Sequence, residues 1–129
     1  MNIEGNTVTV TKSQKETFEF LADLKNFEQL MPASIQKFEV DGDSFIFGLK
    51  GMPEIRLILK EKTPYSNVTL GAASSKLDFQ LVADITEVDA NSSTVQLHFN
   101  GQFNAMMAMM VKRPLNSFIT TLTDNLGQL

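Results

Sequence analysis

Cysteine and tryptophan are absent from this chain of 129 residues, and histidine occurs once, as His98. Without cysteine the chain forms no disulfide and has no thiolate nucleophile. A single histidine and no cysteine also leave it without the ligand sets that hold zinc in proteins. The motifs G-x-x-x-x-G-K-[ST], H-E-x-x-H and G-x-S-x-G are missing, so a phosphate-binding loop, a zinc peptidase site and an α/β-hydrolase nucleophile have no support. We therefore expect no metal and no cofactor.

Basic residues are also few, with 11 Lys and Arg against 15 Asp and Glu and a formal net charge of −4. They stand in pairs at most, as at Lys112-Arg113, whereas nucleic-acid binding needs clustered positive charge. No apolar run approaches the ~20 residues of a membrane-spanning helix. The opening MNIEGNTVTV lacks the basic and apolar regions of a secretory signal. We expect neither a nucleic-acid partner nor a membrane span, and we expect the protein to be cytoplasmic.

The spacing of apolar residues at the start of the chain predicts one strand and two helices. Residues 3–11 alternate between apolar and polar, which is typical of a half-buried strand. Ser13 followed by Glu16 is a capping box, in which each side chain accepts a hydrogen bond from the other residue's backbone N–H, so a helix should begin there. A second apolar run at helical spacing stops before Pro32, which predicts a short second helix.

From residue 38 to residue 99 the apolar period changes to two, which predicts six strands. Asp41-Gly42 is a hairpin signal between the first two of them. Because the other connections are short as well, successive strands should pair antiparallel in one meander. The predicted strands cover residues 38–40, 45–49, 55–59, 68–70, 77–85 and 95–99.

The last 27 residues return to helical spacing and contain few charges. The predicted order is therefore β-α-α-β6-α in a single α+β domain over residues 1–129. The sheet has one apolar face and the long helix has one apolar stripe, and each must bury that surface against the other. The stripe of the second half of this helix is predicted to contain Val111, Leu115, Phe118, Leu122 and Leu126.

Three segments resemble a known superfamily: SQKETFEFLADLKNFEQLMP at 13–32, FGLKGMPEIRLILKEKTP at 47–64 and FNAMMAMMVKRPLNSFITTLTDNL at 103–126. Together with the order of elements they are similar to the helix-grip proteins of the START and birch-pollen-allergen superfamily, in particular small bacterial members of the polyketide cyclase/SRPBCC branch. The resemblance implies a curved antiparallel sheet of about seven strands wrapped on the C-terminal helix. It also implies a hydrophobic ligand, such as a lipid or a polyketide, held between sheet and helix.

The methionines at the start of the long helix are the strongest candidates for contact with such a ligand. Met106, Met107 and Met110 share a helix direction with Pro114, and methionine is unbranched and polarizable, so it adapts to irregular surfaces. Packing into an irregular gap in the core is the alternative role. For the hydrophobic ligand we predict Met106, Met107 and Met110 as a lid, and as the sheet side Phe45, Phe47, Leu57, Leu59, Phe79, Leu81, Leu97 and Phe99.

No residue is predicted to be catalytic. His98 lies on the polar face of its strand, and Arg56 and Asp84 have the parity opposite to the apolar residues of their strands, so all three should face solvent. A cyclase or hydratase remains the alternative, because holding the reacting groups close together can lower the activation barrier with few catalytic groups. That alternative requires Arg56, Tyr65, Asp78, Asp84 or His98 to project into the pocket. A third possibility is a protein-interaction module or homodimer that uses Met109 as an exposed docking residue.

Overall fold

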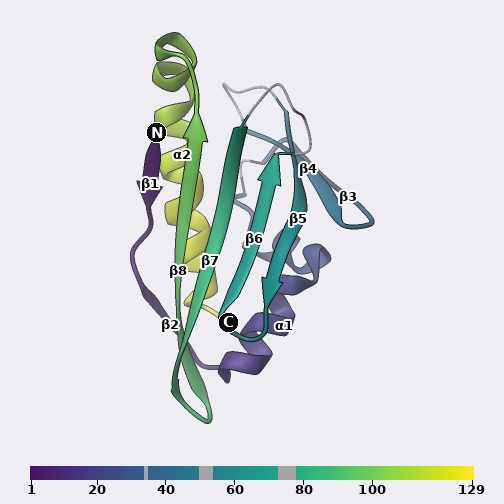
Figure 1. Ribbon diagram of the computed structural model, residues 1–129, viewed down its shortest axis with the longest axis vertical. Helices are drawn as coiled ribbons and strands as arrows, with labels where there is room; N and C mark the ends of the chain where they lie inside the picture. The colour runs from purple at the N-terminus through teal and green to yellow at the C-terminus, as the bar shows by residue number, and fades with distance from the viewer. Residues whose placement is uncertain (34, 50–53, 73–77) are drawn as a thin grey trace.

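The structure is a computed structural model, and it describes residues 1–33, 35–49, 54–72 and 78–129, apart from the side chain of Asp78. The helices are α1 (Gln14–Ala22), the 3-10 helix η1 (Leu24–Leu30) and α2 (Ala105–Leu126). The strands are β1 (Asn2–Glu4), β2 (Val8–Val10), β3 (Lys37–Asp41), β4 (Ser44–Gly48), β5 (Ile55–Thr63), β6 (Asn67–Ala72), β7 (Asp78–Asp89) and β8 (Ser92–Gln102). The antiparallel sheet and the long C-terminal helix that the sequence predicts are confirmed (Figure 1).

Within the described residues the sheet has eight strands in the order β1-β8-β7-β6-β5-β4-β3, with β2 also paired to β8. The strands β3 to β8 form the predicted meander, and the first hairpin turns at Gly42, whose φ of 61° favours glycine. The predicted strand at 77–85 begins in the structure at Asp78, and Leu77 lies outside the described residues.

The single strand predicted over residues 3–11 is wrong, because the structure has two strands there that share β8 as partner. The break falls at Gly5, whose N–H donates to the Leu97 carbonyl at 2.8 Å. A Cβ at Gly5 would come within 3.1 Å of Ile119 and of the Thr123 hydroxyl on α2. The close approach of α2 therefore favours a glycine here, and the strand is interrupted at this contact.

The predicted helix after Ser13 is confirmed as α1, and its capping box is present. The Glu16 N–H donates to Ser13 Oγ at 3.1 Å and the Ser13 N–H to Glu16 Oε1 at 3.3 Å. The second predicted helix is present as η1, but it is a 3-10 helix. Its buried residues Leu24, Phe27 and Leu30 recur every third position, and a 3-10 helix has three residues per turn.

Helix α2 packs against β8, β2 and η1 and covers one face of the sheet (Figure 1). Its buried stripe begins at Val111 and includes Leu115, Phe118, Leu122 and Leu126, as the sequence predicts. The first turns of α2 extend past the end of β8 in Figure 1, and their methionines are at the surface. Helix α2 thus buries one stripe of its second half in the core and is largely exposed in its first turns.

Candidate ligand-binding site

The inward side chains of the sheet fill the space between its centre and α2. Of the eight residues predicted on the sheet side of a ligand, all but Leu59 are buried, and Leu59 is half-buried against the same core. The Phe47 ring stacks on Phe118 of α2 with ring centroids 4.7 Å apart. Phe45 lies beside Phe47 at 6.0 Å. These distances are direct ring contacts, so no ligand fits between Phe47 and the helix.

An apolar pocket lies instead beside this aromatic stack, at the edge where α2 passes the end of β4 and the loop after η1. We call it the Pro114 pocket, and its volume is about 250 Å³. Phe118 and Leu49 are buried and form its apolar floor. The pocket is lined by Pro32, Leu49, Arg113, Pro114, Ser117, Phe118 and Thr121.

Local sequence explains how each element reaches the Pro114 pocket. Leu49 continues the inward alternation of β4, and Pro32 follows the end of η1. At 100° per residue, Pro114, Ser117 and Thr121 fall on the flank of α2 beside the buried stripe. Because proline has no N–H, Pro114 removes one backbone hydrogen bond to the preceding turn, although α2 continues through it. A flank of small side chains next to a proline leaves room that a row of leucines would fill.

The predicted lid methionines lie next to the Pro114 pocket, although they do not line it. By the same helical arithmetic Met107 and Met110 share its flank of α2, one to two turns toward the N-terminus. Met107 is half-buried, whereas Met106 is 74% and Met110 54% exposed. Their side chains are thus at the surface in this structure, and their contact with a ligand stays a prediction.

Positive charge adjoins the Pro114 pocket on the outer side of α2. A second, more open hollow of about 420 Å³ is lined there by Met109, Lys112, Arg113, Asn116 and Ser117. It shares Arg113 and Ser117 with the Pro114 pocket. Within α2 the single acidic residue is Asp124, near the opposite end. An apolar pocket and a basic surface therefore meet at Arg113.

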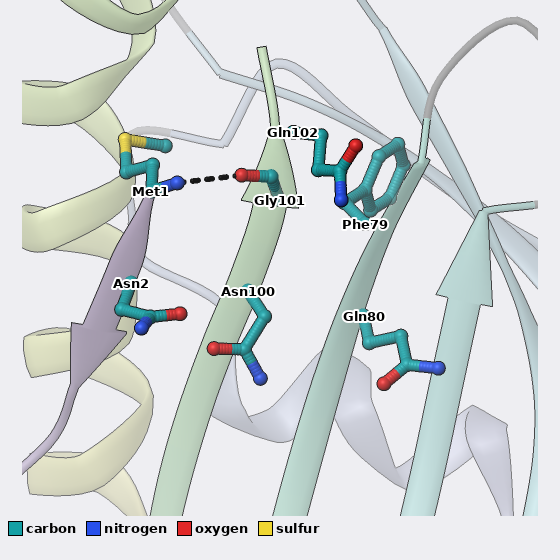
Figure 2. A pocket seen from close by; sticks show the side chains of 7 residues that line it. All are labelled: Met1, Asn2, Phe79, Gln80, Asn100, Gly101 and Gln102. Atoms are coloured by element: carbon teal, nitrogen blue, oxygen red, sulfur yellow. Dashed lines mark hydrogen bonds between the residues drawn. The ribbon is translucent and has the colours of Figure 1, made fainter.

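A third hollow, of about 430 Å³, opens at the edge of the sheet near the N-terminus (Figure 2). Asn2, Asn100 and Gln80 are in register on β1, β8 and β7 and present exposed amides on the outer face, away from α2. The Met1 ammonium donates to the Gly101 carbonyl at 2.7 Å. This polar, open surface suits water better than an apolar ligand. Of the eleven predicted ligand residues, Phe79 lines this hollow, and none of the others lines it or the three other hollows described in this section.

The fourth of these hollows, about 480 Å³ between α1 and the β3–β4 turn, has an acidic rim. Glu19, Asp23 and Asp43 lie on it, together with Lys62. Phe18 and Leu24 contribute its apolar part. The mixture of exposed charges gives it no enclosed apolar wall, so it is a weaker candidate for a hydrophobic ligand than the Pro114 pocket.

The ionisable candidates lie away from the Pro114 pocket. Arg56 is exposed and donates to Ser44 Oγ at 2.8 Å, and Asp84 is exposed and contacts His98 across the outer face at 3.2 Å. Tyr65 is 41% exposed with its ring edge on Phe18. The expectation that Arg56 and Asp84 face solvent is confirmed. None of these four candidates lines any of the four hollows described above, and the side chain of Asp78 lies outside the described part of the chain.

The chain matches no protein-family profile and no curated protein sequence. Many solved structures are similar to it in shape. One is norcoclaurine synthase from Thalictrum flavum in complex with dopamine and hydroxybenzaldehyde, with a TM-score of 0.70 at 10% identity over 99% of this chain and 84% of that one. A conserved protein from Geobacillus kaustophilus has a TM-score of 0.69 at 11% identity, covering 99% of this chain and 93% of that one. A protein from Deinococcus radiodurans reaches 0.63 at 14% identity, again over 99% and 93%.

The chain has a helix-grip fold. The predicted fold class is thereby confirmed, since the described sheet and α2 are arranged as in these structures over nearly the whole chain. Within the described residues, no helix of this helix-grip protein combines the length and the apolar character needed to cross a bilayer.

Sequence reasoning missed most residues that line the Pro114 pocket of this helix-grip protein. It singled out Pro114 and the methionine flank, because both follow from helical spacing. It does not place Pro32, Leu49, Ser117 or Thr121 at a ligand site, because a helix stop, a strand residue and two small polar side chains carry no binding signal by themselves. Arg113 was noted only as one of a basic pair. Their shared location depends on where α2 crosses the end of β4, and local patterns do not encode that crossing.

Proposed function

We propose that this protein is a binding module for a small hydrophobic molecule, which it holds in the Pro114 pocket. The observation that carries the proposal is an apolar hollow with a buried floor between the long helix and the sheet edge. Ligand pockets are typically concave, mostly apolar and bounded by a few polar groups. Further support comes from norcoclaurine synthase, a protein of the same fold whose solved complex contains two small aromatic molecules.

In this proposal the ligand lies on Phe118 and Leu49, and Met107 and Met110 close over it from the preceding turn of α2. Phe47 supports the floor through its stack on Phe118. The other predicted sheet residues belong to the hydrophobic core behind the site and keep it rigid. They are Phe45, Leu57, Leu59, Phe79, Leu81, Leu97 and Phe99. Exposed methionines suit such a lid, because their flexible side chains can adapt to ligands of different shape.

The test is thermal unfolding of the purified protein against a panel of lipids, aromatic polyketides and simple aromatics. A ligand at a free concentration of 100 times its Kd should raise the free energy of unfolding by about 2.7 kcal/mol, which is measured as an upward shift of Tm. Thr121→Phe places a ring in the Pro114 pocket and should abolish the shift. Thr120→Phe, at the exposed neighbouring position of α2, is the matched control and should leave it intact. No shift with any apolar compound, or a shift that survives in Thr121→Phe, would contradict the proposal.

The alternative of a polyketide cyclase or hydratase has weaker support. Norcoclaurine synthase is an enzyme of the same fold, but Arg113 is the single ionisable side chain among the described residues that line the Pro114 pocket. An arginine stays protonated and serves neither as a general acid nor as a general base. A cyclase would therefore have to act through shape and proximity alone. Turnover of an aromatic polyketide that Thr121→Phe abolishes would favour the enzyme.

A protein-interaction module keeps one observation in its favour, the 83% exposure of Met109. Met109→Lys should then dissociate a dimer or a complex, as light scattering after size-exclusion chromatography would show. Binding of small apolar compounds should be unaffected by this change, which separates the two proposals. The cytoplasmic location and the possible homodimer stay predictions.

A further inference from the structure

The Pro114 pocket adjoins a basic surface at Arg113, and this junction indicates what kind of ligand it takes. The pocket and the hollow on the outer side of α2 are separate spaces, but Arg113 and Ser117 line both. A molecule that extends from the apolar pocket into the outer hollow contacts Arg113, because Arg113 lines both. Its outer end then lies in the hollow that Lys112 and Asn116 also line.

The two cations at this junction are available to a ligand. Arg113 and Lys112 are exposed, and neither takes part in the ion pairs found among the described residues. The first turns of α2 contain no acidic residue to neutralise them, since Asp124 lies near the far end of the helix. The chain as a whole carries a net charge of −4, so this positive surface has the opposite sign to the net charge of the protein.

We propose that the ligand is a small amphiphilic carboxylic acid, an inference that rests on the proposed function. Its apolar body lies in the Pro114 pocket on Phe118 and Leu49, and its carboxylate lies in the outer hollow between Arg113 and Lys112. The guanidinium of Arg113 has a planar fork of N–H donors that matches a carboxylate, while Lys112 adds a second positive charge. Asn116 and Ser117 line the same hollow and offer further donors to the carboxylate.

The size of the pocket limits the apolar body. Drug-sized ligands occupy pockets of roughly 300–1,000 Å³. At about 250 Å³ the Pro114 pocket is below that range, so a short alkyl chain or a single aromatic ring fits better than a long lipid. Octanoate and 3-phenylpropionate are therefore suitable probes, with 1-octanol and 3-phenylpropanol as neutral counterparts of the same shape.

Isothermal titration calorimetry with octanoate and 1-octanol on the full chain tests the proposal, using octanoate below its micelle concentration. A hydrogen-bonded charge pair corresponds to a preference of about tenfold for octanoate over 1-octanol at low salt. Because the two cations are exposed, the preference should shrink as salt is added. Arg113→Gln should remove most of the preference, and Lys112→Gln a smaller part. Lys15→Gln on α1 changes the net charge equally and should have no effect.

The outcomes separate this inference from the proposed function. Equal binding of octanoate and 1-octanol, both lost in Thr121→Phe, would overturn the carboxylate proposal and leave the hydrophobic pocket standing. A preference for octanoate that persists in the Arg113→Gln, Lys112→Gln double variant would also overturn it. If no member of the wider apolar panel binds, the proposed function fails as well. Arg113→Lys, which keeps the charge but not the fork, should bind octanoate with intermediate affinity.

Discussion

Thr123 is a residue whose chemistry does not match its surroundings. Its side chain lies in the last turns of α2 at 5% exposure, against the Gly5 backbone that interrupts the first strands. Its hydroxyl has no hydrogen-bond partner among the described residues. A buried hydroxyl without a partner loses its hydration and gains nothing in return, which destabilises the native state by about 1–3 kcal/mol.

We predict that Thr123→Val stabilises the protein by about 1 kcal/mol, because valine has the same shape and no group to desolvate. Urea unfolding followed by circular dichroism measures the change. Thr17→Val is the matched control. Thr17 is also buried, but its hydroxyl forms a 2.8 Å hydrogen bond with Ser93 Oγ. Thr17→Val should therefore lower the free energy of unfolding by about 1 kcal/mol. A loss of stability in Thr123→Val similar to that in Thr17→Val would contradict the prediction.

At the scale of the element, α2 combines two halves with different surroundings. After Pro114 one stripe of the helix is buried in the core, whereas before Pro114 Val111 is its single buried residue and Met106, Met109 and Met110 are at the surface. Pro114 lies between the two halves and removes one backbone hydrogen bond to the preceding turn. We expect the first half to open more readily, which would let the proposed lid move over the Pro114 pocket.

Pro114→Ala should stabilise the domain by up to about 3 kcal/mol, less whatever packing has adapted to the proline ring. It should also slow amide hydrogen exchange over residues 104–113 and slow ligand exchange, because the lid would lose its hinge. Thr120→Ala, an exposed site in the same helix, should change stability by only a few tenths of a kcal/mol. Equal protection on both sides of Pro114 in the wild type would show that no such lid exists.

At the scale of the whole molecule, a single hydrophobic cluster joins the described part of the sheet to α1, η1 and α2. Two groups of aromatic rings occupy its ends. Phe47 and Phe118 stack at the Pro114 pocket, with Phe45 and Phe27 beyond them. At the other end Phe103 lies over Phe79 and Phe99. The first group is fully buried, whereas Phe103 is only partly buried, so the two ends should differ in their contribution to stability.

We predict that Phe118→Ala destabilises the protein by about 3–5 kcal/mol, the usual range for a fully buried phenylalanine. Phe103→Ala should have a clearly smaller effect, because part of its ring already contacts water. Unfolding should remain one transition in both variants, since the cluster is continuous. Urea denaturation with two spectroscopic probes measures this. Equal losses of stability in the two variants would contradict the smaller contribution of Phe103, and two separate transitions would contradict a single core.

Much of the fold was predictable because its signals are local. The alternation of Phe45, Phe47 and Leu49 predicts which face of β4 is inward, and Ser13 with Glu16 predicts where α1 begins. The two errors have different causes. The helix before Pro32 has its apolar residues every third position, which suits a 3-10 helix, but a short run does not distinguish that spacing from an α-helix. The break at Gly5 depends on contact with α2, and nothing in residues 3–11 announces it.

The candidate site likewise combines features that local sequence sets with features that tertiary packing sets. By itself the sequence determined the six strands of the meander, α1, the inward faces, the apolar stripe of α2 and the absence of cysteine chemistry, because each depends on residue type and on near neighbours. Only the tertiary structure decided that Phe47 meets Phe118, and that Pro32 and Leu49 meet Arg113 and Pro114. The hydrophobic effect has no direction, so a pattern states that a face is buried without naming what buries it. The space left beside Phe118 follows from that packing.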